Sequence, residues 1–208
     1  MDIQQLEVFR WQGTDEREAR KHAQDHFGPL EIVVDRIERD GDVTFYAYAC
    51  EQIQSLAGQV ASFVIRMFDS RARISVQPNR DMSEFLVDIR CRNNGFFIGR
   101  HGATLDALEM VISVILNREF PINRIVNLDV NGYRERREES LIRMVKQVIK
   151  DIESDHKERP IADLLPKERK IVHKFLTNHP YLTTVSRGKG RARTLYITPR
   201  DFVGDGEE

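Results

Sequence analysis

Cysteine and long apolar runs are scarce in this sequence of 208 residues. Its two cysteines, Cys50 and Cys91, are too few and too far apart for a disulfide scaffold or a metal-binding pair. No apolar stretch approaches the ~20 residues that span a bilayer, and no signal peptide is recognisable. We therefore expect a reduced, cytoplasmic protein that does not insert into a membrane.

Signatures of catalysis are also missing. The sequence has no Gly-x-x-x-x-Gly-Lys phosphate loop, no nucleophile elbow, and no serine or cysteine beside a recognisable base. His22 and His26 are four apart, as two ligands on one helix would be, but no third and fourth metal ligands follow at a matching spacing. We expect no enzyme, no metal and no cofactor.

Charge is unevenly distributed along the chain. Residues 1–53 hold 12 acidic and 6 basic side chains, residues 54–200 hold 17 and 26, and the last eight hold four acids. The net charge of −1 conceals this division. Such a chain is expected to meet phosphates through its middle and end, and not through its first module. Chance combined with a need for solubility is the alternative explanation.

The most informative motif is a pair of glycines three apart, Gly99 and Gly102, with Arg100 and His101 between them. Glycines let a nucleic-acid strand approach main-chain N–H groups closely, and the start of a helix favours anions. No acidic residue occurs from 91 through 105. About 0.7 such glycine spacings are expected by chance in this composition, so the context has to support the motif.

The flanking patterns supply that context. Residues 84–91 alternate as a half-buried strand does, and residues 104–118 carry apolar side chains at helical spacing, with Thr104 as the expected cap. Residues 54–67 predict another helix, and residues 74–77 and 125–130 predict strands. We expect Phe96 and Phe97 to be core residues. The predicted order is helix, strand, strand, short helix, glycine loop, helix, strand.

A second basic motif lies near the end of the chain. Arg169 and His173 are four apart on a predicted helix, so that both can meet one phosphate or base. A surface pair without a ligand is the alternative. A basic turn then joins two predicted strands. On charge alone we assign four of its residues to phosphate contact: Arg187, Lys189, Arg191 and Arg193.

Residues 54–131 resemble the prokaryotic, or type II, KH domain, whose glycine loop clamps about four nucleotides of a single strand. The resemblance implies backbone contacts from the loop and an apolar groove for the bases beside it. Some KH domains only dimerise, and a tight turn without a ligand stays the alternative. The positions implicated are Ile98, Gly99, Arg100, His101, Gly102, Leu105 and Leu108.

The helix bearing Arg169 and His173, with its small sheet and basic turn, resembles the single-strand-binding R-three-H domain. The two modules in this order, over residues 54–200, resemble the Jag family, also called the SpoIIIJ-associated or KhpB proteins. The resemblance implies a cytoplasmic bacterial RNA-binding protein linked to cell elongation and division. It also implies a small single-KH-domain protein as a type of partner.

The first 53 residues fit the Jag N-terminal domain in order: strand 6–11, helix 14–27 with Thr14 as its cap, then strands 30–37 and 43–49 about an Asp-Gly turn. The glycine-rich, lysine-bearing ending and the long linker common in that family are missing. Because these features are missing, the sequence does not support the partner binding that the Jag N-terminal domain usually performs.

We therefore predict an α+β chain of three small modules. The alternative function is a protein-interaction scaffold that pairs with another KH protein and binds nucleic acid only incidentally. A homodimer and single-stranded DNA in place of RNA also stay open. The segments are a Jag-N-like domain at 1–53, a type II KH domain at 54–131, a connecting helix from Tyr133 to Ile152 and a linker from Glu153 to Asp163 within 132–163, an R-three-H domain at 164–200, and an acidic tail at 201–208.

Overall fold

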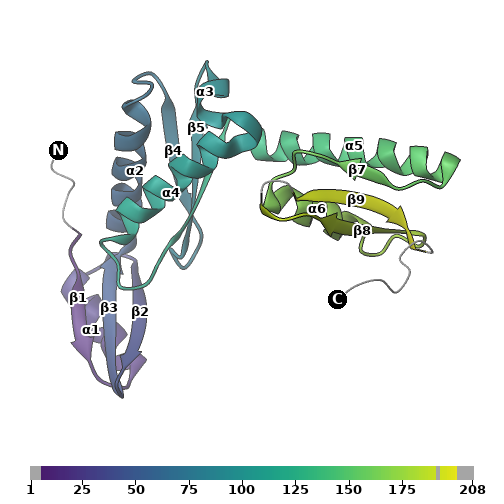
Figure 1. Ribbon diagram of the computed structural model, residues 1–208. Helices are drawn as coiled ribbons and strands as arrows, with labels where there is room; N and C mark the ends of the chain where they lie inside the picture. Colours follow the sequence, from purple (N-terminus) through teal and green to yellow (C-terminus); the bar gives the residue numbers. More distant parts are fainter. Residues whose placement is uncertain (1–5, 191–192, 201–208) are drawn as a thin grey trace. The chain divides into compact units, whose positions relative to one another are not determined.

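The computed structural model describes residues 6–190 and 193–200. The chain divides into two units, residues 1–132 and residues 133–208. Three three-stranded sheets lie within the described residues, each with helices beside it (Figure 1). The chain is therefore α+β, as the sequence predicts. No helix in the described ranges is both long and apolar enough to cross a membrane.

The head module, residues 6–49, opens the first unit. Its elements are β1 (Phe9–Gln12), α1 (Glu16–Phe27), β2 (Ile32–Arg39) and β3 (Asp42–Ala49), with an antiparallel sheet of order β1-β3-β2. Asp40 and Gly41 both have positive φ, as a tight hairpin turn requires. The prediction that Thr14 caps α1 is wrong. Asp15 caps α1, and its Oδ1 accepts the Arg17 N–H at 2.8 Å.

The glycine-loop module, residues 50–131, follows without a linker, because α2 (Cys50–Arg66) begins directly after β3. The boundary predicted between residues 53 and 54 therefore falls inside this helix. The remaining elements are β4 (Arg73–Pro78), β5 (Glu84–Arg90), α3 (Asn94–Ile98), the 3-10 turn η1 (Arg100–Gly102), α4 (Ala103–Asn117) and β6 (Ile125–Val130).

The sheet of this module has the order β4-β5-β6, with β4 antiparallel and β6 parallel to β5. The predicted alternation is confirmed in β5, where Phe85, Val87 and Ile89 are fully buried. Helix α2 packs on β4, α4 packs on β6, and the two helices pack on each other. The element order is the one predicted from the sequence, and it places the glycine loop at the junction of α3 and α4 (Figure 1).

A buried ion pair joins the head module to the glycine-loop module. Arg124, just before β6, donates to the carboxylate of Asp35 in β2, and both side chains are buried. The Arg124 guanidinium also lies 4.9 Å from the ring centroid of Phe120 and 5.9 Å from that of Tyr48. Burial raises the pKa of the Asp35 carboxyl, and the adjacent Arg124 opposes that rise. These contacts fix the head against the neighbouring module.

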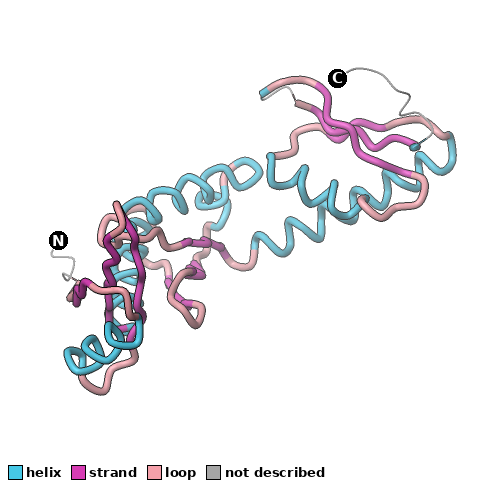
Figure 2. The backbone as a smooth tube through the Cα atoms, turned by 90° about the horizontal axis from the view of Figure 1, so that it is seen from below, coloured by secondary structure: helices cyan, strands magenta, loops and turns pink. Residues whose placement is uncertain are grey.

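The second unit contains α5 (Tyr133–Asp155), β7 (Arg159–Ile161), α6 (Pro166–Leu176), β8 (Leu182–Arg187) and β9 (Thr194–Pro199). Its antiparallel sheet has the order β7-β9-β8. Figure 2 shows α5 and α6 beside these strands. The core includes Leu141, Val145 and Ile152 of α5 together with Val172 and Leu176 of α6.

The prediction of a linker from Glu153 to Asp163 is wrong for residues 159–161. Residues 159–161 form β7, which pairs with β9, and Ile161 is buried in the core of the second unit. The preceding helix contributes side chains to that same core, and so α5 is an integral part of this unit. A strand of three residues that includes Pro160 carries too short a pattern to be recognised by periodicity.

Candidate nucleic-acid interface

The backbone between α3 and α4 explains the first glycine of the motif. The Gly99 N–H donates to the Gly95 carbonyl at 2.9 Å and closes the end of α3. Gly99 has φ 68° and ψ −169°, a combination that is essentially restricted to glycine. A Cβ at this position would lie 2.8 Å from the Cβ of Thr104. Both the conformation and the close approach therefore require glycine.

The second half of the loop continues this turn into α4. His101 has φ 54°, and Gly102 is left-handed at φ 90° and ψ 9°. Gly102 is the N-cap of α4 and, being a glycine, offers no side chain with which to cap that helix; Thr104, the expected cap, lies inside its first turn. The N–H groups at the start of α4 thus have no N-cap side chain to compete with an incoming anion.

The side chains predicted to contact RNA in and beside the loop differ in their exposure to solvent. Arg100 is exposed, whereas His101 and Ile98 are half-buried. Leu105 and Leu108 are buried in the core, with 0% and 7% of their surface exposed. These two leucines therefore support the loop from beneath, and Ile98 is the one member of the expected apolar set with substantial surface.

The two phenylalanines of α3 are not alike. Phe97 is buried, as expected, but Phe96 is 53% exposed, and the expectation that it is a core residue is wrong. Helix α3 has only five residues, so Phe97 fills its one buried position. The Phe96 ring instead lies 5.8 Å from that of Phe68, which is also 53% exposed. Aromatic surface is thus available beside the glycine loop.

Arg169 and His173 both lie on α6, as the motif predicts, and each has a partner within the second unit. The Arg169 Nη1 donates to the Leu164 carbonyl at 2.7 Å, which holds the half-buried guanidinium against the start of the helix. The exposed ring of His173 lies with Nδ1 2.7 Å from Thr184 Oγ1 in β8. This bond fixes one ring nitrogen and leaves Nε2 as the nitrogen to meet a ligand.

Sequence reasoning missed the residues that hold α6 in place. The buried Glu168 accepts from the Leu165 N–H at 2.8 Å and from Arg137 Nε of α5 at 2.7 Å. The first contact satisfies an N–H at the helix start, and the second joins two helices. The signal for the first is the spacing of three residues from Leu165 to Glu168, which is that of a helix cap.

The basic turn after β8 is only partly as expected. Arg187 makes a two-pronged ion pair with Glu158, at 2.7 and 3.0 Å, and its guanidinium lies 4.6 Å from the centroid of the Tyr196 ring. Lys189 and Arg193 are exposed. Arg191 lies outside the described residues. Within this group, Lys189 and Arg193 are better placed than Arg187 to meet a phosphate.

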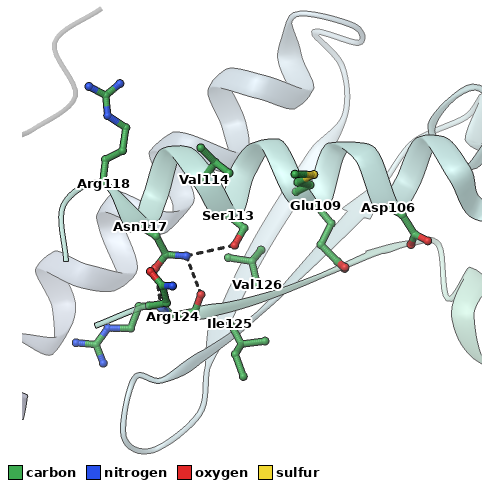
Figure 3. Close-up of a pocket in the computed structure, with 11 residues that line it drawn as sticks. Asp106, Glu109, Ser113, Val114, Asn117, Arg118, Arg124, Ile125 and Val126 are labelled. Atoms are coloured by element: carbon green, nitrogen blue, oxygen red, sulfur yellow. Dashed lines mark hydrogen bonds between the residues drawn. The ribbon is translucent and has the colours of Figure 1, made fainter. Parts of the chain in front are cut away.

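A second surface of the first unit lies on the outer side of α4. Figure 3 shows a hollow between this helix and the start of β6, in which Asn117 donates to Ser113 Oγ at 3.2 Å and to the Arg124 carbonyl at 2.9 Å. Met110, Val114 and Ile125 line the hollow and are more than half exposed. We call this apolar surface the outer hollow.

Comparison with known proteins identifies the domain in the second unit. The family model of the R-three-H domain matches residues 139–199, which confirms the domain predicted from the Arg-x-x-x-His motif. The match begins within α5, at residue 139 and not at residue 164, and so it takes in the helix that contributes to the core of the second unit.

Curated relatives extend the similarity beyond that domain. The chain is 30% identical over 148 residues to the RNA-binding protein KhpB of Clostridium symbiosum, covering 70% of this chain and 67% of the relative. It is 32% identical over 106 residues to the protein of the same name from Lactiplantibacillus plantarum, covering 51% of this chain and 33% of the relative. The Bacillus subtilis protein of that name is 33% identical over 104 residues, covering 49% and 50%. The chain belongs to the KhpB family.

Proposed function

We propose that this chain binds single-stranded RNA through its glycine loop and its R-three-H surface, and that it acts by occupying RNA and not by catalysis. The element order and strand order of residues 50–131 support a type II KH domain. The curated relatives carry the name RNA-binding protein, in agreement with this proposal. A post-transcriptional role in cell elongation and division is part of the proposal.

The observation that carries the proposal is the backbone of the glycine loop. Positive φ angles at Gly99, His101 and Gly102, the close approach of Gly99 to Thr104, and a following helix whose N-cap residue is a glycine form a turn to which a phosphate backbone can come close. Arg100, which is exposed, supplies positive charge.

Two weak sites on one chain reinforce each other, because the second contact becomes intramolecular. The R-three-H site would hold the RNA with Arg169 and His173, with Lys189 and Arg193 as further phosphate contacts. Affinity is then expected to fall steeply with salt, since each phosphate contact releases counterions.

The test is a titration of labelled single-stranded RNA at two salt concentrations into the wild type and into the Arg100→Asp/His101→Asp variant. A large loss of affinity with the fold intact is expected. Arg80→Asp/Arg118→Asp is the control, because it changes exposed arginines at the opposite end of the module. A single-stranded DNA of the same sequence tests whether the 2′-OH contributes. Unchanged RNA affinity in the loop variant would contradict the assignment of the primary site.

The outer hollow favours a second candidate function, that of an interaction scaffold. Its exposed Met110, Val114 and Ile125 would pack against another KH protein, either a small single-KH protein or a second copy of this chain. Size-exclusion chromatography with light scattering separates the two functions. A tight dimer that is indifferent to RNA, and that Val114→Glu dissociates, would favour the scaffold.

A further inference from the structure

Four arginines line a hollow at the end of the β4-β5-β6 sheet that leads into α3. They are Arg71, Arg73, Arg90 and Arg92, and the hollow has a volume of about 640 Å³. We call it the arginine pocket. The acidic residue lining it is Asp69, so the lining carries a net positive charge. None of the four arginines belongs to either of the motifs that the sequence analysis identified.

Two of these arginines oppose each other in the sheet. Arg73 of β4 is the register partner of Arg90 of β5. Like charges directly opposite on adjacent strands are destabilising. Arg90 is compensated by Asp88, with Nε 2.6 Å from the carboxylate. Within residues 6–190 and 193–200, Arg71, Arg73 and Arg92 form no ion pair. An anion in the pocket would relieve this repulsion.

The strand end between Arg90 and Arg92 is held by a side chain from the end of β6. Asn131 Oδ1 accepts the Cys91 N–H at 3.4 Å, and its Nδ2 donates to the Cys91 carbonyl at 2.9 Å. These two bonds fix the backbone that presents both arginines. The fold therefore fixes the positions from which Arg90 and Arg92 extend into the pocket.

Exposed aromatic rings lie on the segments that adjoin the arginine pocket and the glycine loop. Phe68 directly precedes Asp69 of the pocket lining, and its ring contacts that of Phe96 in α3. Phe96 in turn lies three residues before Gly99. Figure 1 shows α3 at the end of the sheet where β5 finishes. Exposed aromatic rings combined with guanidinium groups are typical of surfaces that bind single-stranded nucleic acid, because bases stack on the rings and the cations neutralise the phosphates.

We propose that the arginine pocket binds phosphodiester groups of a single-stranded RNA that continues past the glycine loop, with bases stacked on Phe68 and Phe96. This inference rests on the proposed function. It extends the RNA-binding surface beyond the glycine loop, which in a KH domain holds about four nucleotides. Guanidinium groups alone would also suit an acidic peptide. The aromatic pair favours nucleic acid, because bases stack on such rings and carboxylate side chains do not.

The test compares two labelled RNAs, one of four nucleotides and one of twelve, with the full chain. Arg71→Ala/Arg92→Ala is expected to weaken binding of the longer RNA about tenfold or more and to leave the shorter one unchanged. The slope of log affinity against log salt should fall by about 1.4 for the longer RNA, since each single-strand phosphate contact contributes about 0.7. Phe68→Ala should weaken the longer RNA without changing its salt slope.

Arg80→Ala/Arg118→Ala removes the same charge at the far end of the module and is the matched control. If the pocket variant and this control lose the same affinity for the longer RNA, the inference is wrong although the proposed function stands. If the wild type binds neither RNA, both fail. A pocket variant that loses binding of a hexaglutamate peptide but keeps the longer RNA would assign the pocket to acidic protein segments and overturn the proposal.

Discussion

Glu168 of α6 and Arg137 of α5 form an ion pair, with Oε1 and Nε 2.7 Å apart, in which the glutamate is buried and the arginine half-buried. The hydrogen bond to Glu168 raises the pKa of Arg137. Glu168 directly precedes Arg169, so the pair fixes the part of α6 that carries the predicted RNA contact. The stability of the second unit should therefore depend on it.

Breaking this pair on one side should destabilise the second unit. Arg137→Met leaves Glu168 buried without its cation, and we expect a loss of about 2–4 kcal/mol. The measurement is urea unfolding followed by circular dichroism at 222 nm. Arg143→Met, in the exposed pair of Arg143 with Glu139, is the matched control and should cost under about 0.5 kcal/mol. Equal losses in the two variants would show that burial of Glu168 does not matter.

The ion pair between Asp35 and Arg124 should behave as a coupled unit. Arg124→Met leaves a buried carboxylate and is expected to cost about 3–5 kcal/mol, whereas Asp35→Leu/Arg124→Met should recover much of that loss. Trp11 is the only tryptophan of the chain, and its fluorescence reports unfolding of the first unit. Additive losses in the double variant would contradict the coupling.

Gly99 and Gly58 form a matched pair for testing backbone strain. Gly99→Ala should destabilise the first unit by about 1–3 kcal/mol and reduce RNA affinity, because φ is positive and the new Cβ meets Thr104. Gly58 lies within α2, and nothing lies within 4 Å of where its Cβ would be. Gly58→Ala should therefore stabilise the protein by about 0.5–1 kcal/mol. The prediction fails if both changes shift the unfolding midpoint in the same direction.

Thr184 should affect RNA binding through His173. Thr184→Val removes the hydroxyl that fixes His173 Nδ1, and we expect RNA affinity to fall about three- to tenfold with little change in stability. Thr183→Val, on the adjacent residue of β8, is the control and should bind normally. The same affinity in His173→Ala and in Thr184→Val/His173→Ala would confirm that the hydroxyl acts through the histidine. A lower affinity in the double variant than in His173→Ala would show that the hydroxyl acts independently of it.

Tyr48 should limit stability in alkaline solution. Burial, followed by the nearby charge of Asp35, raises the pKa of its phenol above the usual value of 10.0, so the folded state keeps the proton that the unfolded state loses. Stability is thus full below pH 10 and falls as the pH rises above it. The Tyr48 hydroxyl has no hydrogen-bond partner among the described residues, and Tyr48→Phe should therefore keep neutral-pH stability while flattening the alkaline loss. Tyr181→Phe, at an exposed site, is the control variant for loss of a tyrosine hydroxyl.

Periodicity and glycine chemistry predicted much of the first unit. The alternation of Phe85, Val87 and Ile89 defined β5, and the glycine spacing defined the turn into α4, because both signals are local. Local signals could not show that Phe96 faces outward, since α3 has room for only one buried ring and the partner, Phe68, comes from another segment.

Contacts between distant segments explain what the sequence analysis missed. Strand β7 exists because Ile161 pairs with Leu195 of β9, a relationship that no window of neighbouring residues contains. The arginine pocket likewise depends on the register that sets Arg73 opposite Arg90. The head module was predicted in outline, whereas its fixation by Asp35 and Arg124 joins positions 89 residues apart.

The direct passage from β3 into α2 at Ala49 and Cys50 has a consequence for how the protein moves in solution. With no spacer at this joint and a buried ion pair bracing it, residues 6–132 should tumble as a single particle. Nuclear spin relaxation would then return one rotational correlation time for backbone amides of the head and of the glycine-loop module. A binding event on the head would slow the rotation of the glycine loop by the same factor.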